Sequence, residues 1–145
     1  PELRHLLQIA GKLSLPSDAV KIGVILEGGD YLLALKKAHI YLLPSLREGA
    51  PVTMIEAMAA SCVPIVGSCG GAAMLVTHDC GRLISITTPE QMALEIASEI
   101  KTLWSSPGLL EKLGSAALER VVSRCSESFY REQINAHYQS ISDRN

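Results

Sequence analysis

The chain has 145 residues, of which 48% are apolar and 19% are charged, and its formal net charge is −2. This length and composition are typical of one folded domain with a sizeable core, and they exclude an intrinsically disordered chain. Because the sequence contains few aromatic residues and no cluster of lysines and arginines, it also argues against a nucleic-acid-binding module.

Segments with helical and strand periods alternate along the first part of the chain. Apolar residues recur at helical spacing over 2–13, and Asp30 is expected to cap a helix that ends near Ala38. Pro51 stands at the predicted first position of a helix, where its missing N–H group costs nothing. The predicted helices of this part are 2–13, 30–38, 51–61 and 71–77, and the predicted strands are 20–26, 40–44, 63–67 and 81–86.

Longer helices are predicted to follow. The sequence Thr-Pro-Glu-Gln at 88–91 forms a capping box, which predicts a helix that runs to about Trp104. A Ser-Pro pair at 106–107 begins the next helix, and we expect the closing helices to extend over about 107–141.

Alternating helices and apolar strands predict a parallel sheet with helices on both faces. We therefore expect an α/β, Rossmann-like, doubly wound fold that forms a single domain over residues 1–145. Four clear strands are few for such a sheet, so the domain is expected to be truncated at its N-terminal side. Ligands bind outside the carboxyl ends of parallel strands, which places a site in the loops after Leu26, Pro44, Gly67 and Ile86.

The cysteines and histidines give no sign of a metal site. Cys62, Cys69, Cys80 and Cys125 form no C-x-x-C pair, and the four histidines lack ligand spacing. We expect free thiols, no bound metal and a reducing, cytoplasmic compartment. The longest uncharged run, 57–78, is interrupted by Pro64 and by glycines, so we expect no membrane span.

The loop before the helix at Pro51 is the candidate site. The first amides of that helix, led by Val52, have no intrahelical acceptors, and together with the helix dipole they favour an anion. Gly49 and Ala50 keep side chains away from this position. The sequence therefore predicts an anion-binding turn between the strand and the helix.

Two carboxylates flank this turn. Glu48 precedes it, and Glu56 is the only charged residue between Glu48 and Asp79. Because burying a carboxylate among apolar residues is costly, we expect a ribose or a protein donor to satisfy Glu56. Carboxylates repel phosphate but accept hydrogen bonds from vicinal hydroxyls, which predicts a ligand whose diphosphate joins a sugar to a ribose. An ion pair with a lysine or arginine is the alternative for Glu56.

The segments PSLREG, EAMA, PIV and GG, with the two glutamates in an E-x7-E pattern, resemble the C-terminal, donor-binding domain of the retaining glycosyltransferases of family 4 ("group 1"). The similarity extends from ALKKAHIYLLPS to the closing helices. It implies one half of a GT-B architecture, which binds a nucleotide-diphosphate sugar and transfers a hexosyl unit with retention and without a metal. The acceptor saccharide or lipid-linked glycan would be held by a missing N-terminal domain, so this chain alone is expected to be inactive. Peripheral membrane association of the complete protein is compatible with the resemblance.

Carried over to this sequence, the resemblance implies a catalytic role for Glu48, which would contact the hexose hydroxyls of the donor. Glu56 would contact the ribose hydroxyls, while Gly70 and Gly71 would give the ligand room. The donor-binding residues that the resemblance implies are Gly23, Gly49, Ala50, Pro51, Val52, Glu56, Gly70 and Gly71.

The sequence departs from the family's pattern at several positions. Met74 stands where the Gly-Gly helix of the family usually has a glutamate, and Ala38-His39 replaces its Ala-Asp pair. Arg47 and Arg82 are the nearest candidates to neutralise a diphosphate, with surface arginines as the alternative interpretation.

Three other functions fit parts of the sequence. A glycoside hydrolase also needs two carboxylates, but eight residues at helical rise span about 12 Å, more than such enzymes use. A Rossmann oxidoreductase would fit VGSCGGA at 66–72, which lacks the G-x-G-x-x-G spacing. A non-catalytic sugar-nucleotide-binding or interaction domain of the same fold is favoured by Met74.

Overall fold

The computed structural model describes Lys12 and residues 26–142. The chain divides into two compact units, residues 1–33 and residues 34–145. The predicted strand over 20–26 lies outside the described residues except for Leu26, and the predicted helix over 2–13 lies outside them except for Lys12. Gly23 also lies outside them.

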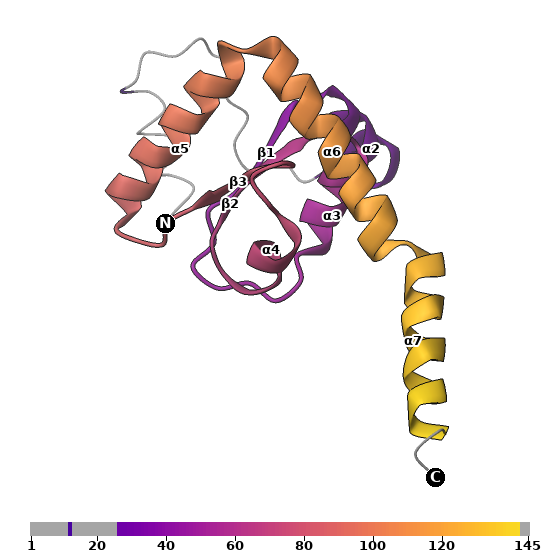
Figure 1. The fold of residues 1–145 in the computed structure, drawn as a ribbon. Coiled ribbons are helices and arrows are strands. Elements are labelled where there is room, and N and C mark those ends of the chain that lie inside the picture. Colours follow the sequence, from indigo (N-terminus) through magenta and orange to yellow (C-terminus); the bar gives the residue numbers. More distant parts are fainter. Residues whose placement is uncertain (1–11, 13–25, 143–145) are drawn as a thin grey trace. The chain divides into compact units, whose positions relative to one another are not determined.

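Three parallel strands form the sheet of the described residues (Figure 1). They are β1 (Ile40–Leu43), β2 (Val63–Gly67) and β3 (Arg82–Ile84), in the order β1-β2-β3. All five residues of β2 are buried, as expected for the central strand of a parallel sheet that is covered on both faces. The predicted parallel sheet is thus confirmed.

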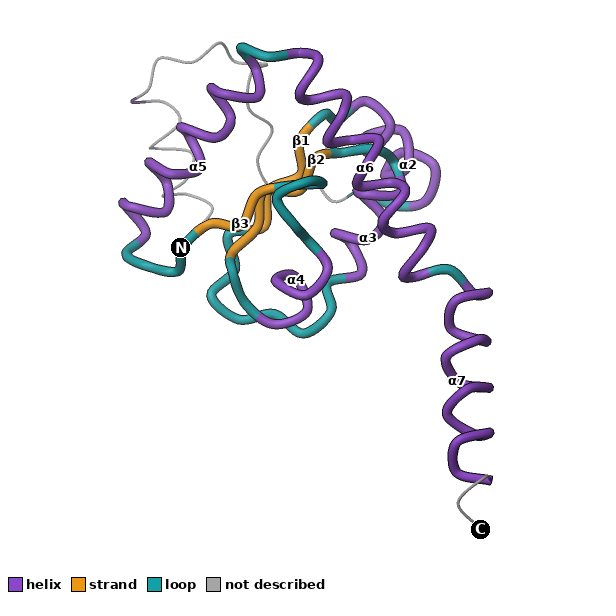
Figure 2. Tube along the Cα trace, viewed as in Figure 1, coloured by secondary structure: helices purple, strands orange, loops and turns teal. Residues whose placement is uncertain are grey.

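Helices alternate with these strands and then close the chain (Figure 2). The helices are α2 (Gly28–Lys37), α3 (Val52–Ala59), α4 (Gly70–Leu75), α5 (Pro89–Trp104), α6 (Pro107–Cys125) and α7 (Glu127–Ser142). The capping box before α5 is confirmed in part, because Thr88 Oγ1 accepts a hydrogen bond from the amide of Gln91 at 3.4 Å.

Two helix starts differ from the prediction by one or two residues. Asp30 lies within the first turn of α2 rather than at its cap, because the helix already begins at Gly28. Pro51 is the N-cap of α3 rather than its first helical residue, because its ψ of 107° is extended. At the other end, Ser61 takes a left-handed φ of 63°, so α3 stops at Ala59 instead of reaching 61.

Helices cover both faces of the sheet, which confirms the doubly wound arrangement (Figure 1). On one face Val66 packs with α3, α4 and α6, and on the other Val63 and Ile65 pack with α5 and the start of α6. The first core comprises Met54, Met58, Val66, Ala72, Val76, Cys80, Ala117 and Val121. The second comprises Val63, Ile65, Ile84, Met92, Leu103 and Leu113.

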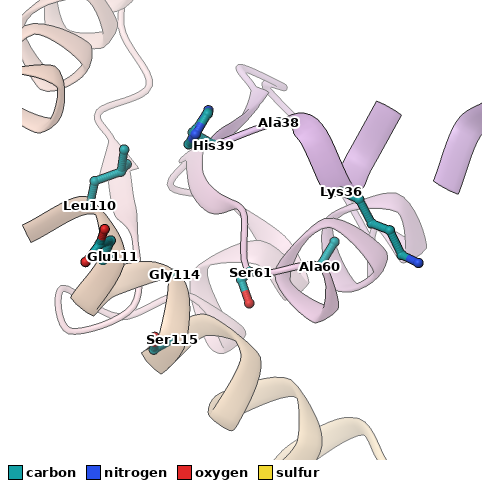
Figure 3. A pocket seen from close by; sticks show the side chains of 9 residues that line it. All are labelled: Lys36, Ala38, His39, Ala60, Ser61, Leu110, Glu111, Gly114 and Ser115. Atoms are coloured by element: carbon teal, nitrogen blue, oxygen red, sulfur yellow. The ribbon is translucent and has the colours of Figure 1, made fainter. Parts of the chain in front are cut away.

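Helix α6 passes very close to the turn that leads into β2. A Cβ atom on the buried Gly114 would overlap the carbonyl oxygen of Ser61. Figure 3 shows Gly114 beside Ser61 at the edge of a hollow. This contact fixes α6 at the amino end of β2 and leaves the carboxyl ends of the strands to carry loops.

Candidate functional site

The loop after β1 leads to the N-terminus of α3 at the carboxyl end of the sheet. Gly49 and Ala50 are exposed, and Val52 is 64% exposed. The first turn of α3 is therefore open to solvent, as an anion-binding turn requires.

The N-terminus of α3 presents backbone donors to this opening. The amides of Met54 and Ile55 donate to the carbonyl oxygen of Pro51, at 3.1 and 3.3 Å. Within the described part of the chain, no acceptor bonds to the amides of Val52 and Thr53. The cap has no side-chain acceptor, and the first turn contains no carboxylate. Two oriented amides and the helix dipole thus remain for an anion.

Glu48 lies four residues before Val52 and lines a hollow of about 410 Å³. Its side chain is half-buried, and its Oε1 atom accepts a hydrogen bond from Ser45 Oγ at 2.7 Å. The hollow is lined by Leu46, Arg47, Glu48, Gly49, Cys69 and Gly70. Three residues predicted for the site, Glu48, Gly49 and Gly70, are therefore brought together.

Glu56 is exposed on the outer side of α3. Met54, Ala57 and Met58 form the buried face of this helix, and the helical period turns residue 56 away from them. The expectation that apolar neighbours bury its carboxylate is therefore wrong. Glu56 instead shares the exposed face of the helix with Val52 and Thr53, one turn from the open amides.

Close packing requires glycine at positions 70 and 71, which the sequence did not reveal. A Cβ on Gly70 would overlap the carbonyl oxygen of Glu48, and a Cβ on Gly71 would overlap that of Gly49. The amide of Gly71 also donates to the carbonyl oxygen of Gly49. The start of α4 and the loop after β1 therefore pack backbone against backbone.

Arg82 is engaged away from the hollow. Its Nε atom donates to Glu99 Oε2 at 2.9 Å, and its Nη1 atom donates to the carbonyl oxygens of His78 and Gly81. With 11% of its side chain exposed, Arg82 is a structural residue and not a surface arginine. Arg47, by contrast, is exposed and lines the hollow.

A second hollow of about 420 Å³ lies at the opposite ends of the strands (Figure 3). It is lined by Lys36, Ala38, His39, Ala60, Ser61, Leu110, Glu111, Gly114 and Ser115. Because ligands of parallel α/β sheets bind at the carboxyl ends, this hollow is not the candidate site. Nothing in the sequence predicted it.

All four cysteines are free thiols, as predicted. Burial raises the pKa of the Cys62 thiol, and it raises that of Cys125 against an opposing effect of the nearby Arg120 guanidinium. Among the residues that the structure describes, no cluster of His, Cys, Asp and Glu could hold a metal ion. No described helix is long and apolar enough to span a membrane.

Comparison with solved structures identifies the same fold in several proteins. A sucrose-phosphate synthase from Thermosynechococcus elongatus superposes with a TM-score of 0.74 at 22% identity, over 98% of this chain and 35% of that one. The C-terminal domain of a glycosyl transferase group 1 family protein (LpcC) from Francisella tularensis has the same TM-score of 0.74 and identity of 22%, over 86% of this chain and 62% of that one. Anabaena HepE in complex with UDP-glucose also superposes with a TM-score of 0.74 at 22% identity, over 94% of this chain and 36% of that one.

Sequence comparison gives the family. The MMP alpha-(1->4)-mannosyltransferase of Mycolicibacterium hassiacum is 31% identical over 123 residues, which cover 85% of this chain and 29% of the relative. The chain thus spans less than a third of that curated relative. The family model "Glycosyl transferases group 1" matches residues 8–120, most of the chain. The chain therefore belongs to the group 1 family of glycosyl transferases.

Proposed function

We propose that this chain is the donor-binding domain of a retaining glycosyltransferase that uses a nucleotide-diphosphate sugar. The observation that carries the proposal is the open N-terminus of α3, whose Val52 and Thr53 amides bond to no described acceptor and follow directly on the loop whose Glu48 and Gly49 line the hollow. Membership of the group 1 family and the UDP-glucose bound to the structurally similar HepE support this ligand class.

The proposed chemistry follows from the charges that develop during transfer. Breaking the anomeric C–O bond places positive charge on the sugar and negative charge on the departing diphosphate. Amides aimed at that diphosphate stabilise it without having to reorganise, and each is worth about 3 kcal/mol when well placed. The helix N-terminus therefore supplies leaving-group stabilisation, and we propose that transfer needs no metal.

The two glutamates bind the rings on either side of the diphosphate in this proposal. Glu48 accepts hydrogen bonds from the hexose hydroxyls, and Glu56, exposed one turn along α3, accepts them from the ribose. The exposure of Glu56 on the same face of α3 as Val52 and Thr53 supports this role. The acceptor, a saccharide or lipid-linked glycan, would be bound by another domain of the complete, cytoplasmic protein.

A single-residue change tests the helix N-terminus. Val52→Pro removes one amide hydrogen at a position where helices accept proline, and the extended ψ of Pro51 suits a following proline. Val52→Ala is the matched control, because it keeps the amide and removes only an exposed side chain. We expect calorimetry with UDP, GDP, UDP-glucose and GDP-mannose to find a ligand, and Val52→Pro to weaken its binding about tenfold. Equal affinities of the two variants, or binding of no nucleotide, would contradict the proposal.

The second candidate is a non-catalytic sugar-nucleotide-binding or interaction domain. Met74 favours it, since this residue is 82% exposed on α4 where the family's pattern has a glutamate. Donor turnover by the complete protein distinguishes the two functions. Transfer that Glu48→Ala strongly impairs supports the enzyme, and nucleotide-sugar binding without turnover supports the alternative.

A further inference from the structure

Ser45 makes a direct contact with the carboxylate of Glu48. It lies two residues after the end of β1, and its Oγ atom donates to Glu48 Oε1 at 2.7 Å in a partly buried position. No described residue donates to Oε2 of Glu48, so this second oxygen is the one that remains for a ligand. The hydroxyl thus occupies one carboxylate oxygen and leaves the other unbonded.

The backbone of Ser45 is fixed by the neighbouring strand. A Cβ on Gly67, the last residue of β2, would overlap the carbonyl oxygen of Ser45. The Sγ atom of Cys69 donates to the same carbonyl at 3.4 Å. Because β1 and β2 pair in parallel up to Leu43 and Val66, the two loops leave the sheet together, and the glycine lets them touch. The backbone that carries the Ser45 hydroxyl is therefore packed against the end of β2 and the loop that follows it.

We propose that Ser45 is the positioning residue of this site, which orients the carboxylate of Glu48 toward the donor sugar, with Gly67 holding its backbone in place. This inference rests on the proposed role of Glu48 in donor binding. A glutamate side chain has several rotamers, and one charge-assisted hydrogen bond to a fixed hydroxyl selects among them. Because a misplaced group costs transfer rate more than ground-state affinity, the effect of Ser45 is expected mainly in kcat.

Removal of the hydroxyl tests this inference in the complete protein. With UDP-glucose, or whichever nucleotide sugar of the panel turns over, we expect Ser45→Ala to lower kcat about tenfold and to change KM by less than about threefold. Ser98→Ala is the control, because this exposed serine lies on α5, which does not line the hollow, and its hydroxyl bonds to no residue that the structure describes. We expect it to keep full activity.

A matched pair separates the hydroxyl from the size of the side chain. Threonine and valine have nearly the same shape and differ in one hydroxyl. We therefore expect Ser45→Thr to be at least fivefold more active than Ser45→Val, a difference in rate that corresponds to about 1 kcal/mol. This comparison also applies if Ser45→Ala unfolds, which thermal denaturation would reveal. Equal activities of the two variants would overturn the inference.

A double-mutant cycle distinguishes failure of this inference from failure of the proposed function. If Ser45 acts through Glu48, Ser45→Ala has no further effect on kcat in a Glu48→Ala background. A further tenfold loss in that background, or an active Ser45→Ala beside an impaired Glu48→Ala, would overturn the positioning role alone. Wild-type activity of Glu48→Ala would instead overturn the proposed function.

Discussion

The carbonyl oxygen of Glu48 lies where a Cβ atom on Gly70 would stand. Gly70 also has a φ of 50°, in the left-handed region that residues with side chains rarely adopt. The loop that presents Glu48 and the start of α4 are thus packed against each other at backbone distance. The two loops that the sequence singled out therefore form one structural unit.

Gly70→Ala is expected to destabilise the chain. The added methyl group must adopt an unfavourable φ and also displace the Glu48 carbonyl, so we expect a loss of about 2 kcal/mol or more in the free energy of unfolding. Gly108→Ala is the control, since Gly108 lies in the first turn of α6 with open space around it and a φ that alanine accepts. Denaturation with urea measures both, and a loss below about 0.5 kcal/mol in Gly70→Ala would show that the contact yields without cost.

Elements with strong local signals were predictable from the sequence. The continuous apolar run of β2, and the Thr88 cap and first-position proline of α5, depend on neighbouring residues alone, and both are confirmed. The start of α3 was predicted one residue early, because proline has the same φ at the cap and at the first helical position. Only ψ separates the two, and the sequence does not determine it.

The site was predictable only in part. The position of Glu48 beside an open helix N-terminus followed from the sequence, whereas the Ser45 hydroxyl bond and the Gly67 contact depend on how close β1 and β2 bring their loops. The exposure of Glu56 could have been found, because Met54, Ala57 and Met58 already define the buried face of α3 at helical spacing.

At the turn before β2, in contrast to Gly70, one substitution is expected to stabilise the chain. Ser61 holds a left-handed φ of 63°, and we expect Ser61→Gly to stabilise the chain by about 0.5–1 kcal/mol because glycine adopts this conformation freely. Gly114→Ala, which places a methyl group against the Ser61 carbonyl, is expected to destabilise it although alanine favours a helix. Urea denaturation of the two variants would contradict this account if their effects had the reverse signs.

We expect the buried Cys62 thiol to make the free energy of unfolding depend on pH in the alkaline range. Its buried thiol donates to the carbonyl oxygens of Leu35 and Ala38, both at 3.3 Å, and burial raises its pKa above the ordinary value. The folded chain therefore holds this proton more tightly than the unfolded chain. The resulting stability is complete below the ordinary pKa of a thiol and is lost as the pH rises through the folded pKa.

We expect the free energy of unfolding to fall as the pH rises above the ordinary thiol pKa of about 8.5, and to fall less steeply in Cys62→Ser, whose hydroxyl does not titrate there. Denaturation at a series of pH values under reducing conditions measures the two slopes. The difference between the two proteins at about pH 7 provides the baseline for any general effect of the substitution. Parallel curves would show that Cys62 does not contribute to the alkaline loss.

Arg47 and Arg82 are expected to separate donor binding from stability. Arg82 is largely buried and bonded to Glu99 and two carbonyl oxygens, so Arg82→Ala should cost about 2 kcal/mol of unfolding free energy and leave nucleotide affinity unchanged. Arg47 is exposed in the hollow beside Glu48, so Arg47→Ala should leave stability unchanged and weaken binding of UDP-glucose or UDP about threefold at low salt. Urea denaturation and calorimetry on both variants complete the comparison. A loss of affinity in Arg82→Ala alone would place the diphosphate near β3 instead of at the N-terminus of α3.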